Sequence, residues 1–543
     1  MSQRSRALGL LLLVCLAAVL AVGCSSLPPL DGRTPSTALA SAQARDTRLG
    51  RAQLEHARAH PGESGIYALA DPHEAFAARV LLARTAEHTL DVQYYIWQND
   101  LTGTMLFDAL RAAAQRNVRV RLLLDDNKTS GLDATLAALD AHPNIEVRLF
   151  NPFVIRSPRW IGFLTDFSRL NRRMHNKSFT ADNAATIIGG RNIGDEYFGA
   201  TDGMLFADLD VLAVGRVVQD VSQDFDRYWN SESSYPVGLI LPQAQGGLLE
   251  KLASDAHVVE ENPASEMYVK ALRESRFMGE LLDGRLTMEW APTHMVSDDP
   301  AKGLGKVPPQ QLLTYELERI IGKPESDVAL ISSYFVPTSA GVDGFVSLAA
   351  RGVDIQILTN ALETTDVPAV HAGYAKRRKP LLLAGVKLYE MKAPASDAPT
   401  TDARRQGGSG LLGSGSAGGS RSGGSGSGGV FGSSSSSLHA KTFAVDGSRI
   451  FVGSFNFDPR SAKLNTELGF VIDSPAMARN IQRAFREGIP AAAYQVHLSQ
   501  TGDLYWTEIR DGQLIRYDSE PGTGLWRRIV VALLSVLPIE WLL

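Results

Sequence analysis

Cysteine is scarce in this sequence. Cys15 and Cys24 are the only two among 543 residues, so the body of the chain has no cysteines for a disulfide framework or a thiolate metal site. A surplus of positive charge is also lacking, because 54 Lys and Arg stand against 59 Asp and Glu and give a formal net charge of -5. The chain therefore has no global basic field that would attract nucleic acid.

Long apolar runs are rare as well. One extends from Ala7 to Val22. A second lies within Gly524 to Leu543, is interrupted by Pro538 and Glu540, and has an apolar part that is shorter than the about 20 residues that a membrane span needs. A multi-pass membrane protein is therefore excluded, and the 44% hydrophobic content is that of a globular protein. The terminal stretch predicts either a buried helix or an interfacial helix with Trp and Arg at its ends.

The N-terminus has the features of a targeting segment, because Arg4 and Arg6 precede the first apolar run. The following "AVGCSS" resembles a bacterial lipobox, in which Cys24 receives acyl chains; a plain membrane anchor is the alternative. Cys15 lies in the part to be removed, which leaves Cys24 without a disulfide partner. We expect a lipoprotein of the bacterial cell envelope that faces the periplasm. Because Ser25 follows the cysteine, the outer membrane is favoured over the inner membrane.

Two distant segments share one spacing of polar residues. They are "RRMHNKSFTADNAATIIGGRN" and "LHAKTFAVDGSRIFVGSFN", and the second repeats the His, Lys, Asp, Gly and Asn of the first at identical intervals. Such a repeat indicates a duplicated unit. The matched residues are His175, Lys177, Asp182, Gly189 and Asn192 in the first copy and His439, Lys441, Asp446, Gly453 and Asn456 in the second.

The order of strands and helices is duplicated too. A strand–helix–strand pattern over residues 89–126 recurs over 327–360. The α/β class is expected, with two tandem domains that have mixed, mostly parallel sheets flanked by helices and that pack as a pseudo-two-fold pair. The expected units are a signal peptide (1–23), a tether and helix (24–65), domain 1 (66–235), a connecting segment (236–310), domain 2 (311–490) and a hairpin with an apolar tail (491–543).

The second copy contains an insertion. Residues 407–437 hold 13 Gly and 12 Ser in 31 positions, a composition that behaves as flexible coil and cannot bury a core. A tolerated insertion is the favoured interpretation, and a mobile lid over the site is the alternative.

The repeated residues have the chemistry for phosphoryl transfer. Two residues apart on a strand, His and Lys project from the same face, so each pair can share a pocket, and the adjacent glycines allow the backbone to approach a ligand. One imidazole can attack phosphorus while the other protonates the leaving alkoxide. The phosphate oxygens would be neutralised and oriented by Lys177, Lys441, Asn192 and Asn456.

Four carboxylates receive supporting roles. Asp208 and Glu467 follow the two motifs in comparable strands and are expected to hold the imidazole tautomers. Asp182 and Asp446 belong to the motifs but are expected to cap turns through backbone N–H groups. No metal and no other cofactor is expected, because a Lys beside each His would repel a cation.

Two further clusters leave alternatives open. Asp125 and Asp126 in "LLLDDNK" suggest either Mg²⁺ or, as favoured here, a strand end that continues into a loop. The "KRRKP" segment from Lys376 to Pro380 suggests either a solvated helix face or a patch that attracts anionic head groups.

The two His-x-Lys-x4-Asp motifs, each followed by Gly and Asn, resemble those of the phospholipase D superfamily. "LNRRMHNKSFTADN", "GGRNIGDEYFG", "SSYFVP" and "LPIEWLL" make the chain similar to the bacterial cardiolipin synthases within it. The resemblance runs from about residue 65 to the end, and the Gly/Ser insertion departs from it.

The resemblance implies a membrane-associated enzyme with one active site shared by both halves. It also implies transfer of a phosphatidyl group to phosphatidylglycerol from phosphatidylethanolamine or phosphatidylglycerol, without a metal, with His175 as nucleophile and His439 as acid and base. Phospholipid hydrolysis and, at lower weight, nucleic-acid cleavage are the alternatives. No nucleic-acid partner is expected, and protein partners are unknown.

Overall fold

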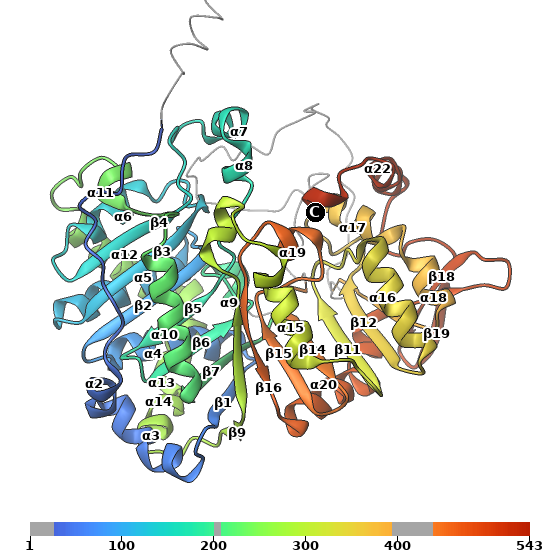
Figure 1. The fold of residues 1–543 in the computed structure, drawn as a ribbon, viewed down its shortest axis with the longest axis horizontal. Helices are drawn as coiled ribbons and strands as arrows, with labels where there is room; N and C mark the ends of the chain where they lie inside the picture. The colour runs from blue at the N-terminus through green and yellow to red at the C-terminus, as the bar shows by residue number, and fades with distance from the viewer. Residues whose placement is uncertain (1–25, 200–207, 394–437) are drawn as a thin grey trace, which may run out of the picture.

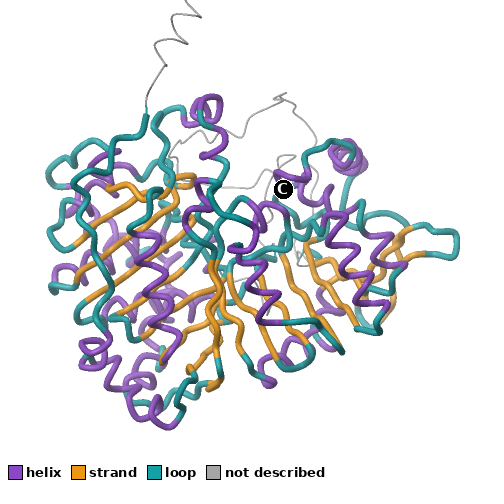
Figure 2. The backbone as a smooth tube through the Cα atoms, in the orientation of Figure 1, coloured by secondary structure: helices purple, strands orange, loops and turns teal. Residues whose placement is uncertain are grey.

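The computed structural model describes residues 26–199, 208–393 and 438–543 (Figure 1). The expected signal peptide (1–23), Cys24 and the insertion at 407–437 lie outside these ranges. Within them the chain forms two α/β halves that lie side by side, each built on one large β-sheet with helices on its faces (Figures 1 and 2).

The first half contains a nine-stranded sheet within the described residues, in the order β8-β4-β3-β2-β5-β6-β7-β1-β9. Its strands are β1 (Ser64–Leu69), β2 (Thr89–Ile96), β3 (Arg119–Lys128), β4 (Ile145–Phe150), β5 (Ser178–Ala181), β6 (Ala185–Gly189), β7 (Asp210–Gly215), β8 (Ser234–Pro236) and β9 (Glu289–Ala291).

The second half contains, in the part of the chain described, a ten-stranded sheet of order β10-β16-β15-β14-β11-β12-β13-β17-β18-β19. Its strands are β10 (Thr293–Ser297), β11 (Asp327–Ser332), β12 (Asp354–Asn360), β13 (Lys387–Met391), β14 (Lys441–Val445), β15 (Arg449–Gly453), β16 (Leu468–Ile472), β17 (Ala493–Leu498), β18 (Leu504–Arg510) and β19 (Gln513–Tyr517).

The mixed character of both sheets is confirmed, but the expected parallel majority is wrong. Among the described strands, only the β2–β3, β3–β4, β11–β12 and β12–β13 pairs are parallel. The reason is that each motif folds as an antiparallel hairpin, β5–β6 and β14–β15, which adds to the parallel core on one side. A short turn can only join antiparallel strands.

Helices cover the sheets on both faces (Figure 2). Those of the first half and the connecting region are α2 (Ser41–Asp46), α3 (Arg48–Ala59), α4 (Pro72–Thr85), α5 (Leu101–Gln115), α6 (Asp133–Asp140), α7 (Gly162–Thr165), α8 (Phe167–Leu170), α9 (Asp195–Phe198), α10 (Arg216–Trp229), α11 (Val237–Ile240), α12 (Leu248–Glu260), α13 (Glu266–Glu274) and α14 (Phe277–Leu282). Those of the second half are α15 (Leu313–Ile321), α16 (Thr338–Ala350), α17 (Pro368–Ala375), α18 (Arg378–Leu383), α19 (Pro459–Lys463), α20 (Pro475–Glu487), α21 (Ile489–Ala492) and α22 (Leu525–Ser535).

Local sequence signals explain where the long helices begin. Asp71 caps α4 by accepting the amide of Glu74, and Pro72 occupies the first helical position, where no intrahelical N–H bond is lost. Asp100 caps α5 in the same manner. Between the two sheets, buried side chains such as Ile188 and Phe470 belong to one apolar cluster, so the halves share a core.

The segments outside the two central units are packed rather than free. Residues 26–40 run along the first half, where the Arg33 guanidinium donates to the Ser231 and Ser234 carbonyls and Arg121 donates to the Ser36 carbonyl. The region 236–310, expected to be a connection, supplies β9 to the first sheet and β10 to the second. In the described ranges, none of the helices is both long and apolar enough to cross a bilayer.

Candidate active site

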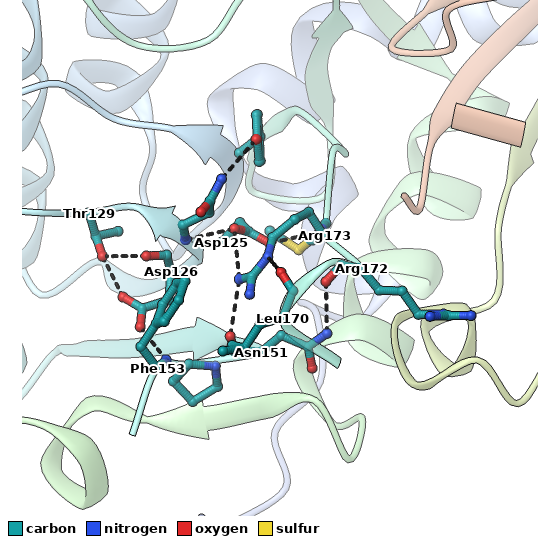
Figure 3. Close-up of polar contacts among 12 residues, drawn as sticks. Asp125, Asp126, Thr129, Asn151, Phe153, Leu170, Arg172 and Arg173 are labelled. Carbon is teal, nitrogen blue, oxygen red and sulfur yellow. Dashed lines mark hydrogen bonds and ion pairs between the residues drawn. The ribbon is translucent and has the colours of Figure 1, made fainter. Parts of the chain in front are cut away.

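The loop that leads to His175 is fixed by a buried carboxylate at the end of the parallel strands. Asp125 accepts the Met174 amide at 2.8 Å and lies 3.3 Å from Nη1 of Arg173 (Figure 3). Asp126 accepts the Phe153 amide and the Thr129 hydroxyl (Figure 3). β3 continues through both aspartates to Lys128, so the expected strand end comes later. Both carboxylates hold loops, and the described residues contain no cluster of three potential metal-ligating side chains.

The same loop is bonded to the other half of the molecule. The His175 amide donates to the Thr466 carbonyl and the Thr466 amide donates to the Arg173 carbonyl, both at 2.9 Å. This short parallel bridge sets the register between two segments that are far apart in the sequence. It places Glu467, the next residue, beside the imidazole.

Each imidazole is bonded to a carboxylate from the opposite half. Nδ1 of His175 lies 2.8 Å from Oε2 of Glu467, and Nδ1 of His439 lies 2.7 Å from Oδ2 of Asp208. A carboxylate at Nδ1 fixes the ring orientation and leaves Nε2 for chemistry. The sequence indicated these two carboxylates but not that they exchange partners between the halves.

Both histidines line one cavity of about 800 Å³, to which the two halves contribute. Asn192, Asn456 and Lys441 also line it. Lys177 is not among the lining residues; its ammonium group donates to the His175 carbonyl at 2.5 Å and lies over the Tyr95 ring. Lys441 therefore shares the cavity with His439, as expected, whereas Lys177 does not line the cavity beside His175.

Several other cavity residues were not predicted. The Tyr95 and Tyr197 rings meet His175 and His439 edge-on, at centroid distances of 5.0 and 5.2 Å. Ser333 bonds the Asn456 carboxamide, and Asp458 and Arg460 line the same wall. A signal existed for some of them, because Ser333 lies in "SSYFVP" and Asp458 lies two residues after Asn456.

Known proteins resemble this chain over most of its length. A family model described as "Cardiolipin synthase, PLD-like domain" matches residues 81–229 and 426–489. Cardiolipin synthase C of Escherichia coli (strain K12) is 48% identical over 496 residues, which cover 91% of this chain and 100% of that protein. An uncharacterized protein of Helicobacter pylori (strain ATCC 700392 / 26695) is 30% identical over 498 residues, 91% of this chain and 92% of the relative. The chain belongs to the phospholipase D superfamily.

The superfamily motif aspartates lie outside the cavity of this phospholipase D-type enzyme. Asp182 accepts the amides of Glu87, His88 and Thr89, and Asp446 accepts those of residues 325–327. The expected bonds to backbone N–H groups are present, but the amides belong to the loop before β2 or β11 and to the first residue of that strand, and not to the turn of the motif.

The motif glycines lie close to neighbouring strands. A Cβ on Gly189 would lie 2.2 Å from Oδ1 of Asp210, and one on Gly453 would lie 2.4 Å from the Leu468 carbonyl. Both positions therefore have a close approach to an adjacent strand, and the expected approach of the backbone to a ligand stays a prediction.

Replacing Asp182 with alanine should lower the free energy of unfolding by about 3 kcal/mol, because three backbone amides at a fully buried carboxylate lose their acceptor. Asp446→Ala, at a partly exposed position, should cost about half as much, because water can replace the carboxylate there. Chemical denaturation of the two variants measures the difference. Equal losses of unfolding free energy in the two variants would contradict the explanation that burial of the carboxylate sets the size of the effect.

The electrostatic environment of the two imidazoles differs. Burial and then the neighbouring Lys177 and Lys441 lower the pKa of His175 well below its ordinary value. The pKa of His439 is also lowered, by burial and Lys441, but the Asp208 carboxylate partly opposes this. His439 is therefore the imidazole with the stronger local support for a proton.

The pKa values of Asp208, Glu467 and Lys177 differ as well between the surroundings of the two imidazoles. Burial disfavours ionisation of Asp208, but His439 and Lys441 outweigh it and hold the pKa of Asp208 below its usual range. Burial raises the pKa of Glu467 to about 7, although Lys177 opposes the shift. Burial lowers the pKa of Lys177 to about 7. An anionic phosphate in the cavity would favour the protonated form of this lysine.

Proposed function

We propose that this phospholipase D-type enzyme is a cardiolipin synthase that transfers a phosphatidyl group between phospholipids through a phosphohistidine. The acceptor is phosphatidylglycerol, and the donor is phosphatidylethanolamine or a second phosphatidylglycerol. The observation that carries the proposal is that one cavity is lined by two imidazoles, each held at Nδ1 by a carboxylate of the opposite half. The 48% identity to cardiolipin synthase C of Escherichia coli supports the choice of reaction.

In the first step, Nε2 of His175 attacks the donor phosphorus and His439 gives its proton to the departing alkoxide. Ethanolamine or glycerol leaves, and the phosphatidyl group remains on His175. His175 suits attack because its lowered pKa keeps the ring neutral. His439 suits proton donation because the Asp208 carboxylate stabilises its imidazolium.

In the second step, the roles of His439 reverse. Its neutral imidazole takes the proton from the primary hydroxyl of phosphatidylglycerol, whose oxygen attacks phosphorus and releases His175. Lys177, Lys441, Asn192 and Asn456 are assigned to the phosphate oxygens, of which Lys441 and the two asparagines line the cavity. Water in place of the alcohol would give phosphatidic acid with the same groups.

The envelope location is part of the proposal. Lipidation of Cys24 would anchor the protein to a membrane facing the periplasm, with the outer membrane favoured. Several acyl chains at about 0.8 kcal/mol per buried methylene make such attachment permanent.

Incubation with labelled phosphatidylglycerol, with and without phosphatidylethanolamine, tests the reaction. We expect labelled cardiolipin, with release of ethanolamine in the mixture that contains phosphatidylethanolamine and of glycerol in the mixture that contains phosphatidylglycerol alone. A His175→Ala/His439→Ala variant is the control for contaminating activity. Phosphatidic acid as the sole lipid product would identify a hydrolase instead, and cleavage of single-stranded DNA in a parallel assay would identify a nuclease.

A further inference from the structure

The C-terminal helix α22 presents an apolar face to solvent. Val531 is its buried apolar side chain and packs in a small cluster with Leu362 and Ala372. The large apolar side chains of the tail that are exposed are Leu525, Trp526, Ile529, Leu533, Val536, Leu537 and Trp541. An unbroken exposed set of this kind marks an interaction surface.

Polar contacts, rather than burial of this face, hold the tail in place. Arg377 and Lys376 form ion pairs with Glu540, Arg460 donates to the Leu542 carbonyl and Arg527 donates to the Thr365 carbonyl. "KRRKP" is therefore a solvated face only in part, since Lys376 and Lys379 are exposed but Arg378 is buried and paired with Glu390 and Glu520. These contacts fix α22 with its apolar side outward.

A second exposed apolar group lies on the first half. Trp160, Leu164 and Phe167 are exposed on and beside α7 and α8. In Figure 1, α7 and α8 stand on the same side of the molecule as α22, with the C-terminus between them. Two apolar projections from different halves therefore face one direction.

The active-site cavity reaches the C-terminal tail. Leu542 and Leu543, which follow α22, line the cavity together with His175 and His439. The described part of the chain also begins on this side of the molecule (Figure 1).

We propose that α7–α8 and the α22 tail form a bilayer-docking surface that holds the cavity mouth against the head-group layer. Trp with Arg beside it, as at Trp526 and Arg527, suits a lipid–water interface. A helix of 11 residues can lie in that interface but is too short to span a bilayer. The inference rests on the proposed function, which requires phospholipids to reach the cavity. A protein partner bound over both apolar groups would block their entry.

Tryptophan quenching by brominated phospholipids tests docking without turnover. The full chain, carrying His175→Ala, is reconstituted into vesicles of phosphatidylglycerol and phosphatidylethanolamine. We expect bromolipid to quench its emission, and Trp160→Phe/Trp526→Phe/Trp541→Phe to remove most of that quenching. Trp290→Phe, in β9 at the opposite end of the molecule (Figure 1), is the matched control and should leave it unchanged. Undiminished quenching in the triple variant would overturn the proposal.

Activity on two physical forms of one substrate gives a second readout. Leu533→Asp and Leu164→Asp should each lower kcat/KM on vesicle phosphatidylglycerol by about tenfold, since a charge replaces an inserted apolar side chain. Activity on monomeric short-chain phosphatidylglycerol should not change. The controls Leu514→Asp and Val258→Asp alter equally exposed residues, 73% and 65%, outside the surface. An equal loss on both substrates, or a dimer in detergent that Leu533→Asp dissociates, would refute bilayer docking.

Discussion

His439→Ala should still release about one equivalent of p-nitrophenol from a p-nitrophenyl phosphodiester of a diacylglycerol, whereas His175→Ala should release none. Nitrophenolate leaves without a proton, so loss of the general acid does not prevent the first step. The phosphatidyl group then remains on His175, because no base activates the alcohol or water. With a phospholipid donor, whose alkoxide needs the proton, His439→Ala should lose about 10²- to 10⁴-fold in rate.

Mass spectrometry of the quenched His439→Ala reaction should locate the phosphatidyl group on the peptide that contains His175. His371→Ala provides the histidine control, since His371 is paired with Glu520 away from the motifs. A burst from His175→Ala instead would reverse the assignment of the two histidines. Full steady-state activity of either variant would exclude a mechanism shared between the halves.

Asp208→Asn should move the alkaline limb of the kcat/KM profile to lower pH and reduce activity at neutral pH by about two orders of magnitude. The Asp208 carboxylate raises the pKa of His439 against the lowering effects of burial and Lys441. Without that negative charge the pKa of His439 falls further, so the general acid loses its proton at a lower pH. Measurement of kcat/KM against pH for both proteins gives the shift.

Glu467→Gln is the matched comparison on the other imidazole. Burial raises the pKa of Glu467 to about 7, so below neutral pH this substitution removes less negative charge than Asp208→Asn does. We expect the alkaline limb to move less than in Asp208→Asn. An unchanged limb in Asp208→Asn would contradict the role of His439 as the acid.

Local sequence spacing was sufficient to predict much of the site. The repeated motif identified side chains that line the cavity, namely both His, both Asn and Lys441, because their positions are set by hairpins of a few residues, β5–β6 and β14–β15. Whether each residue plays its assigned catalytic part stays a prediction. The two α/β halves and their mixed sheets also followed from the alternation of strands and helices.

Longer-range features could not be predicted from that spacing. The exchange of Glu467 and Asp208 between the halves depends on the bridge of Met174 to Thr466, which joins segments about 290 residues apart and leaves no periodic signal in either. The contact of the Lys177 ammonium group with the Tyr95 ring likewise joins two different strands and leaves no signal in the spacing of the motif.

The exchanged carboxylates also constrain how such a molecule could have arisen. A half taken alone has a histidine whose Nδ1 lacks its acceptor and a carboxylate that has no ring to hold. An ancestor with a single copy of the motif would have needed two identical subunits, each completing the other. Fusion of two such copies would preserve that reciprocity and would leave the two rings free to differ in acidity.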